Sequence, residues 1–284
     1  MQLALVASAS SLSLSLLAGG GEPLFFFLLT WYGLAVFQEP VNLFRKALSR
    51  MGQSWLMPSG VAFCVMVLMG FLCLPFDLPI AKAMLSGVTP GELRGIFARG
   101  EVFGHAYGMV AIAFTIYLLS PKNRSAVPRL ILNCVVAGLT ADLLKVAVWR
   151  IRPRSDQLLE VNSDTFLGTI FTNTDWTWAQ LIDSNRHSFP SAHTAVAVAF
   201  AISLAKLFPE GRWWFALLAL VCALNRIDGG AHFPSDVFWG AAVGIATTAF
   251  CAQSRGISRL LNRWESKVGL TTEPQATISY RKSA

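Results

Sequence analysis

Three short polar stretches in an otherwise apolar chain contain the side chains with the clearest potential for chemistry. Between them they provide three cations, two histidines, one hydroxyl and one carboxylate: Lys145 and Arg152 in the first, Ser191 and His193 in the second, and Arg226, His232 and Asp236 in the third. Such a set can bind a phosphate group through its charged oxygens and transfer it to an imidazole. Charged groups at membrane depth are costly, so their concentration in three places predicts a functional site.

The third stretch has the most specific spacing. His232 and Asp236 are four residues apart, and Pro234 indicates that a helix begins between them. In a regular first turn the carboxylate reaches back to one imidazole nitrogen and fixes the tautomer, which leaves the other nitrogen available as a nucleophile. Arg226 precedes the turn at Gly229-Gly230 and can point into the same pocket. The competing interpretation is a structural hydrogen bond between His232 and Asp236 at a helix start.

The second stretch, Pro190-Ser191-Ala192-His193, is predicted to open a helix, because proline is favoured in a first turn. The free N–H groups that follow make an anion site, aided by the helix dipole. Ser191 can donate its hydroxyl to that anion and His193 can deliver a proton. Alternatively, Ser191 simply caps the helix and His193 is a polar residue at the membrane interface.

The first stretch places Lys145 and Arg152 seven residues apart, on nearly the same face of a helix if one helix contains both. Lysine offers a point charge to phosphate, whereas arginine offers a planar fork. Each cation taken alone is explained more simply as snorkelling to the membrane surface, and this interpretation is preferred for Arg150 and Arg154. Asp142, one turn before Lys145, is expected to pair with it or with a neighbouring arginine.

The elements that must position these residues are apolar helices. Of the 284 residues, 54% are hydrophobic and only 14% are charged, which indicates a polytopic membrane protein of the all-α class. The prediction is a membrane helical bundle with six core transmembrane helices, at about residues 55–76, 106–119, 130–149, 191–208, 213–224 and 237–252. The expected organisation is a hydrophobic N-terminal segment with an interfacial amphipathic stretch (1–50), the six-helix membrane domain (51–254) and a polar cytoplasmic tail (255–284). Residues 1–37 are open to three interpretations: a signal peptide, a hairpin or an extra span.

The distribution of basic residues predicts the sidedness of the bundle. They cluster before the first span, in the turn at 121–129, in the turn with Lys206 and Arg212, and in the tail. With six spans these segments share one side, which the positive-inside rule makes cytoplasmic. The three polar stretches then lie on the outer or periplasmic face of a cytoplasmic (inner) membrane. The net charge of +7 favours anionic lipids or an anionic substrate over nucleic acid, because the bases are spread among membrane segments.

Lys-x6-Arg-Pro, Pro-Ser-x-His and Arg-x5-His-x3-Asp, in this order, resemble the signature of the type 2 phosphatidic acid phosphatase superfamily. The resemblance covers about residues 55–252. It implies a six-helix membrane bundle with its site at one face, and a metal-independent phosphatase that acts through a phosphohistidine. It also implies a role for each residue: His232 as nucleophile, Asp236 as its orienting partner, His193 as general acid, and Lys145, Arg152, Ser191 and Arg226 as phosphate ligands.

Two positions depart from the family pattern. Ala192 stands where the pattern has glycine, and Asn225 where it has serine. Alanine excludes only glycine-type backbone angles, and the backbone N–H of Ala192 can still donate to phosphate, so activity is expected to survive. His187 is a further candidate for substrate contact, although a loop histidine is the simpler interpretation. The long segment 150–189 is either a partial lid that admits a lipid laterally or a plain surface loop.

These features predict an integral membrane lipid phosphatase acting on phosphatidic acid, phosphatidylglycerol phosphate, an isoprenyl diphosphate or a phosphorylated lipid A. Two alternatives are open: a lipid phosphotransferase using the same site, and a non-catalytic lipid-phosphate binder or transporter. No metal is expected, because two arginines, a lysine and a helix N-terminus can stabilise phosphoryl charge. No cofactor, nucleic acid or obligate protein partner is expected. The expected partners are the phosphorylated lipid substrate and the surrounding membrane lipids.

Overall fold

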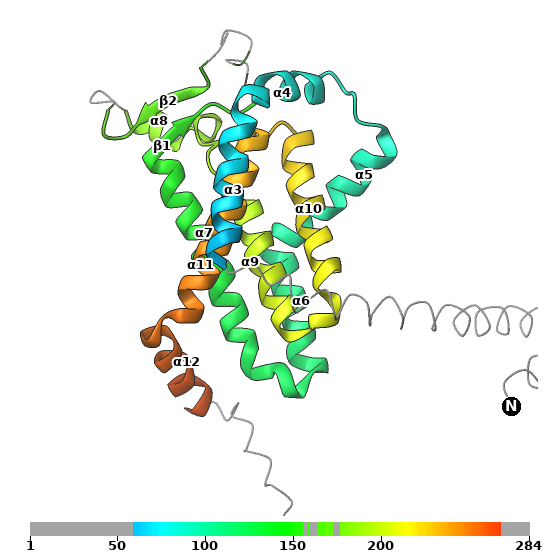
Figure 1. Ribbon diagram of the computed structural model, residues 1–284, viewed down its shortest axis with the longest axis vertical. Helices are drawn as coiled ribbons and strands as arrows, with labels where there is room; N and C mark the ends of the chain where they lie inside the picture. The colour runs from blue at the N-terminus through cyan, green and yellow to red at the C-terminus, as the bar shows by residue number, and fades with distance from the viewer. Residues whose placement is uncertain (1–58, 156–157, 159–163, 173–176, 268–284) are drawn as a thin grey trace, which may run out of the picture. The chain divides into compact units, whose positions relative to one another are not determined.

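The computed structural model describes residues 59–155, 158, 164–172 and 177–267. The predictions for the N-terminal segment 1–50 and for the tail beyond residue 267 lie outside this part of the chain. The described residues form a bundle of helices whose long members run roughly along one direction (Figure 1).

The N-terminal half of the bundle consists of two interrupted helical runs. In the first, α3 (Ser59–Cys73) continues through η1 (Leu74–Phe76) into α4 (Asp77–Leu85). In the second, α5 (Gly91–Gly100) leads through η2 (Glu101–Gly104) to α6 (Ala106–Leu119), with a bend of 66° between the parts before and after residue 105.

The C-terminal half contains the helices that carry the three polar stretches. After η3 (Pro121–Ala126) the order is α7 (Val127–Ala147), α8 (Trp178–Ile182), η5 (Ser184–Arg186), α9 (Ala192–Leu207), η6 (Pro209–Gly211), α10 (Arg212–Asp228), α11 (Pro234–Gln253) and α12 (Arg255–Lys267). Proline lies in the first turn of both α7 and α11, where its missing N–H has no intrahelical partner to lose. The start that Pro234 predicts for α11 is therefore confirmed.

Each of the six predicted spans overlaps a helix of the bundle within the described residues. Among the described residues, three helical runs are long and apolar enough to cross a membrane: Ser59–Leu85, Pro121–Ala147 and Pro234–Gln253. The bent pair Gly91–Gly104 and Ala106–Leu119 would add a fourth if it acts as one span. α9 and α10, with 16 and 17 residues, are shorter than the roughly 20 residues of a full crossing. The count of six spans therefore stays a prediction.

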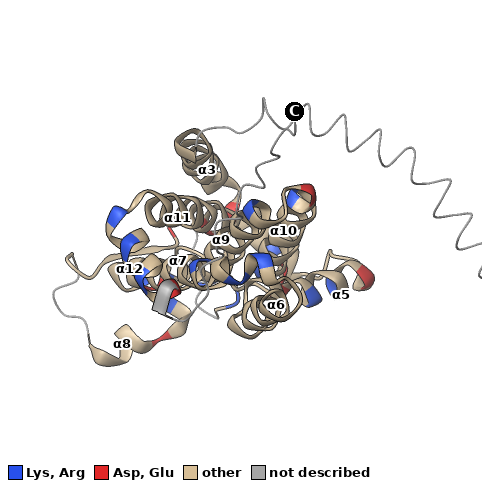
Figure 2. Ribbon diagram, turned by 90° about the horizontal axis from the view of Figure 1, so that it is seen from below, with Lys and Arg blue, Asp and Glu red and all other residues tan. Residues whose placement is uncertain are grey.

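α9 is the central helix of the bundle and packs against α7, α10 and α11 (Figures 1 and 2). Its alanines allow close approach: Ala195, Ala197 and Ala199 are fully buried. On the facing side, Gly240 of α11 lies against the backbone of Ser191, and Gly244 lies against that of Ala195. Small residues on both helices thus bring the start of α9 next to the start of α11, as in other tightly packed membrane helices.

The segment after α7 departs from the all-α prediction. Val148–Arg150 (β1) pairs antiparallel with Phe166–Thr169 (β2), so the helix, predicted to end at about Trp149, ends at Ala147 and does not contain Arg152. A β-branched and an aromatic residue, Val148 and Trp149, follow that helix end and favour an extended backbone. Trp149 is only 2% exposed, so burial of its indole stabilises the ribbon. One helix does not contain both Lys145 and Arg152, so the condition for aligning them on one helix face is not met.

Candidate active site

The three polar stretches meet at one end of the bundle. The last turns of α7 and α10 and the first turns of α9 and α11 lie together there, with the β1–β2 ribbon beside them (Figure 1). The three cations are also close enough to His232 to affect it electrostatically, because the charges of Arg152, Lys145 and Arg226 each lower its pKa. The chain thus brings three cations from three separate segments around one buried imidazole.

His232 is held in one orientation by a backbone carbonyl. Its side chain is 2% exposed, and its Nδ1 lies 2.5 Å from the carbonyl oxygen of Ser188. A carbonyl can only accept, so Nδ1 carries the proton and Nε2 has a free lone pair. Burial, followed by the charges of Arg152, Lys145 and Arg226, lowers the pKa of His232 well below 6.5. His232 is therefore neutral at pH 7, as a nitrogen nucleophile must be.

Asp236 does not make the expected hydrogen bond to His232. Its Oδ2 is 3.9 Å from Nδ1 of the imidazole and instead accepts from Oγ of Ser188 at 2.6 Å and from the backbone N–H of Phe233 at 2.9 Å. Phe233 immediately precedes α11 and has an N–H that needs an acceptor, and the carboxylate three residues later turns back to it. Asp236 thus positions Ser188, and the carbonyl of Ser188 positions His232.

The other carboxylate oxygen of Asp236 binds Arg150, a residue that the sequence analysis assigned to the membrane surface. That interpretation is wrong, because the Arg150 side chain is 1% exposed. Its Nη1 donates to Oδ1 of Asp236 at 2.5 Å and to Oγ of Ser235 at 2.8 Å, while its Nη2 donates to Oδ2 of Asp77 at 2.6 Å. Its Nε donates to Oγ1 of Thr165 at 3.0 Å.

The guanidinium of Arg150 also lies between two aromatic rings, 4.3 Å from the centroid of Phe166 and 4.2 Å from that of Phe233. Asp77, at the start of α4, further accepts from the backbone N–H and the hydroxyl of Ser235. This buried network of Asp77, Arg150, Ser235 and Asp236 joins α4, β1 and α11 beneath the site. The cation of this network, Arg150, positions other side chains and is not assigned to phosphate binding.

Ser191 caps α9 in the structure. Its Oγ accepts from the backbone N–H and the hydroxyl of Thr194, at 3.4 and 2.9 Å, and its backbone N–H donates to the carbonyl of Asp236 at 3.0 Å. The cap interpretation is therefore confirmed, and a hydroxyl donation to phosphate stays a prediction. The first backbone N–H groups of α9, including those of Ala192 and His193, have no intrahelical acceptor by helix geometry.

Arg226 and His193 share a partner that sequence reasoning missed. Oε1 of Glu101 lies 2.5 Å from Nη1 of Arg226 and 3.7 Å from Nε2 of His193. The ring of His105 stands edge-on to that of His193, with centroids 5.5 Å apart. Glu101 and His105 belong to η2 and the residue after it, which reach the site because of the bend before α6. Nε of Arg226 is buried and has no hydrogen-bond partner among the described residues.

Lys145 and Arg152 lie near the same site although they occupy different elements. Nζ of Lys145 contacts Oδ1 of Asp142 at 2.8 Å, which confirms the predicted pair. Arg152 donates from Nε to the carbonyl of Ser184 at 2.8 Å and from Nη2 to that of His187 at 3.3 Å, so it also ties down the segment before α9. Burial and the charges of Arg154 and Arg226 lower the pKa of Arg152 to about 10, which leaves it charged at pH 7.

His187 lies close to these cations. Burial, and then Lys145 and Arg152, lower its pKa from 6.5. Its Nε2 is buried and finds no hydrogen-bond partner among the described residues. This unpaired nitrogen keeps His187 a candidate for substrate contact, which stays a prediction.

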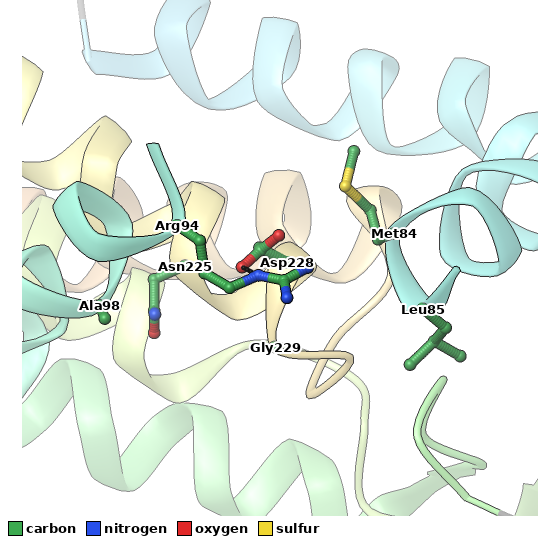
Figure 3. Close-up of a pocket in the computed structure, with 7 residues that line it drawn as sticks. All are labelled: Met84, Leu85, Arg94, Ala98, Asn225, Asp228 and Gly229. Atoms are coloured by element: carbon green, nitrogen blue, oxygen red, sulfur yellow. Dashed lines mark hydrogen bonds and ion pairs between the residues drawn. The ribbon is translucent and has the colours of Figure 1, made fainter. Parts of the chain in front are cut away.

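A cavity of about 380 Å³ opens beside the end of α10 that carries Arg226. It is lined by Met84, Leu85, Arg94, Ala98, Asn225, Asp228 and Gly229 (Figure 3). Nε of Arg94 and Oδ2 of Asp228 form an ion pair across it at 3.2 Å. Within the described ranges, no three histidine, cysteine or acidic side chains group together as metal ligands.

Comparison with known proteins identifies the family. A sequence model of the PAP2 superfamily matches residues 126–259. The decaprenylphosphoryl-5-phosphoribose phosphatase of Mycolicibacterium smegmatis is 32% identical over 163 residues, which cover 57% of this chain and 78% of that protein. The chain belongs to the PAP2 superfamily. The matched region contains all three polar stretches, so the family that they predicted is confirmed.

Two further proteins resemble this PAP2 chain, one over a shorter stretch and the other at lower sequence identity. The lipid A 1-phosphatase of Rhizobium etli is 36% identical over 110 residues, 39% of this chain and 42% of that protein. The chain thus spans about two fifths of the length of this relative. The crystal structure of Aquifex aeolicus LpxE superposes with a TM-score of 0.45 and 20% identity, covering 63% of this chain and 96% of that chain.

The two departures from the PAP2 pattern fit the local structure. Ala192 is the first residue of α9, where the backbone is helical, and no non-glycine residue of the described part has a positive φ. Glycine is therefore not needed there. Asn225 accepts from Nη1 of Arg226 at 3.4 Å, so it keeps a polar contact with the arginine that follows it.

Proposed function

We propose that this chain is an integral membrane lipid phosphatase that removes phosphate from a lipid phosphate or diphosphate through a phosphohistidine on His232. The observation that carries the proposal is the state of His232: buried, neutral, with Nδ1 held by the carbonyl of Ser188 and three cations around it. Its free Nε2 is the nucleophile. Membership of the PAP2 superfamily and the apolar helices support a membrane phosphatase.

In the first proposed step, Nε2 of His232 attacks phosphorus and the bond from phosphorus to the lipid oxygen breaks. His193 donates its proton to that oxygen, so the lipid leaves as an alcohol, or as a monophosphate when the substrate is a diphosphate. Lys145, Arg152 and Arg226, with the first N–H groups of α9, stabilise the charge on the equatorial oxygens. Three cations suit a phosphoryl group because catalysis of its transfer is mainly positioning and charge stabilisation.

In the second step, water attacks the phosphohistidine while His193, now neutral, accepts a proton from it. The bond from phosphorus to Nε2 breaks, and inorganic phosphate leaves. Asp236 acts as a positioning residue in both steps. It holds Ser188, whose carbonyl keeps the proton of His232 on Nδ1 and stabilises the positive charge that the imidazole gains on phosphorylation.

The substrate is proposed from the shared feature of the relatives, which is a phosphate on a lipid or a lipid-linked sugar. One relative is named for lipid A and another for a decaprenylphosphoryl phosphoribose. Phosphatidic acid, phosphatidylglycerol phosphate, an isoprenyl diphosphate and a phosphorylated lipid A are the candidates to compare. Purified protein in detergent is expected to release inorganic phosphate from at least one of them.

The decisive control is His232→Ala, which is expected to abolish phosphate release, with Ser184→Ala as a matched loop variant that retains it. Undiminished turnover by His232→Ala would refute the phosphohistidine. Acid-labile radiolabel on wild-type protein after incubation with ³²P-labelled substrate is expected, and none on His232→Ala. Transfer of the label to a second lipid would favour the phosphotransferase alternative, and binding of every lipid without phosphate release would favour a non-catalytic binder.

We also propose that the site faces the outer or periplasmic side of the cytoplasmic membrane. The opposite end of the bundle is rich in Lys and Arg, along α12 and at the nearby helix ends (Figure 2). Cytoplasmic ends of membrane helices carry such an excess. In a parent without native cysteines, an impermeant thiol reagent applied to intact cells is expected to label Thr172→Cys in the turn after β2 but not Lys122→Cys between α6 and α7. The reverse pattern would invert the topology.

A further inference from the structure

The carboxylate of Glu101 occupies the position on Arg226 where a phosphate oxygen would bind. Its Oε1 lies 2.5 Å from Nη1 of Arg226, in direct charge-assisted contact, and 3.7 Å from Nε2 of His193. These two residues are the ones proposed to bind phosphate and to protonate the leaving oxygen. A carboxylate on both of them therefore imitates the anion that they are arranged to receive.

Glu101 and a phosphate group cannot both make close contact with Nη1 of Arg226 without repulsion. Two like unit charges about 4 Å apart repel by roughly 1 kcal/mol in water and several-fold more in a protein environment. The Glu101 side chain is 37% exposed, so it has room to leave toward solvent, whereas the Arg226 side chain is only 11% exposed. Of the two side chains in this pair, the carboxylate has the more room to move.

The backbone of η2 is what brings Glu101 to the site. Gly104, at the end of η2, lies so close to α9 and α10 that a Cβ there would be 2.6 Å from the carbonyl oxygen of His193 and 2.5 Å from Sγ of Cys222. Phe103 is buried beside Phe200, which anchors the same turn. A short 3₁₀ turn at the 66° bend therefore presents the carboxylate, while its two flanking helices stay packed.

We propose that Glu101 is an internal competitor for the phosphate site: its carboxylate neutralises Arg226 and His193 between turnovers and must swing away from them for phosphate to bind. This inference rests on the proposed function for the assignment of Arg226 to phosphate. It makes Glu101 a residue that sets substrate affinity. Glu101 touches no reacting atom once phosphate is bound, so it affects binding and leaves the chemical step unchanged.

The test measures the affinity of purified full-length protein for orthovanadate by isothermal titration calorimetry in detergent. Glu101→Gln is expected to lower the Kd about three- to tenfold, the range for losing one competing, partly exposed charge contact. Glu92→Gln, which removes the same charge from an exposed position on α5, is the matched control and is expected to leave the Kd unchanged. An equal or higher Kd for Glu101→Gln overturns the proposal.

Two further measurements separate this proposal from the proposed phosphatase activity. In a His232→Ala background the gain in affinity from Glu101→Gln is expected to persist, because the competitor acts on Arg226 and not on the nucleophile. In an Arg226→Ala background the gain is expected to vanish, which a merely structural Glu101 would not cause. With a lipid phosphate that is turned over, KM is expected to fall with kcat within about twofold of wild type; a lower kcat at unchanged KM overturns the proposal.

Discussion

Replacing Arg150 by methionine is expected to destabilise the protein more than any change to a cation proposed to bind phosphate. Methionine approximates the length of the arginine stem but removes the charge and every hydrogen-bond donor. Asp77 and Asp236, 2% and 0% exposed at their side chains, would then remain buried without their shared cation. A buried carboxylate without a partner is far less favourable than the same group in water.

The magnitude follows from the contacts. Breaking a buried ion pair by removing one partner typically costs about 3–5 kcal/mol, and Arg150 has two such partners. Stacking between Phe166 and Phe233 adds a contribution of order 1 kcal/mol. We therefore expect a loss of about 4 kcal/mol or more in the free energy of unfolding. For a chain of this size that corresponds to a fall in Tm of roughly 10 °C.

The assay is thermal unfolding of purified protein in detergent, followed by circular dichroism and by phosphate release after brief heating. Arg154→Met, at an exposed position four residues away, is the matched control and should shift Tm little. Adding Asp77→Asn to Arg150→Met should recover part of the lost free energy of unfolding, because it removes one of the two buried carboxylate charges left without a partner. A fall of less than 1 kcal/mol for Arg150→Met would refute the network as the support of the site.

Three other perturbations test the geometry around the proposed nucleophile, His232. Ser188→Ala removes the hydroxyl bond to Asp236 but keeps the carbonyl bond to His232, so kcat is expected to fall more than KM changes, with a loss of about 1–3 kcal/mol in unfolding free energy. Gly240→Ala places a methyl group against the backbone of Ser191 and is expected to cost about 1–3 kcal/mol, measured by thermal unfolding; an unchanged Tm would refute the close packing. The pKa values of His232 and His187 are lowered in the folded protein. Below pH 6.5 the unfolded chain therefore binds more protons than the folded chain does. The free energy of unfolding is expected to fall as the pH falls, by up to about 1.4 kcal/mol per pH unit for each histidine. His187→Asn should reduce this slope in a comparison of Tm at pH 7 and pH 5.5; an identical slope would contradict the assignment.

The helices could be predicted from the sequence because their signal is local. Apolar runs of adequate length, bounded by proline and by basic turns, identify the six predicted spans as helical segments, whereas α12 (Arg255–Lys267) lies in the segment predicted only as a polar tail. Pro234 marks the start of α11 because the first turn is where proline costs nothing. The end of α7 two residues before the predicted Trp149 has an equally local cause, because Val148 and Trp149 favour an extended strand.

The support of the site could not be predicted, because its partners are far apart in the sequence. Arg150 is separated by 73 residues from Asp77 and by 86 from Asp236. It is one of three arginines at alternate positions, with Arg152 and Arg154, and no local pattern tells which of them points inward. Glu101 is separated from Arg226 by 125 residues and lies in a polar turn that resembles an ordinary loop. A lone acid directly after an apolar span, as Asp77 is, was the available signal for the network.

The contacts divide the cations of this site by their freedom to bind an anion. Arg150 forms ion pairs with Asp77 and Asp236, and the guanidinium of Arg152 donates hydrogen bonds to two backbone carbonyls. Lys145 and Arg226 each have one carboxylate partner, Asp142 and Glu101, and both of those carboxylates have exposed surface. A phosphate can therefore displace carboxylates at the rim without disturbing the buried ion pairs that hold Ser188 and His232. Under the proposals above, separating positioning from binding in this way lets affinity change at Glu101 while the geometry of His232 stays fixed.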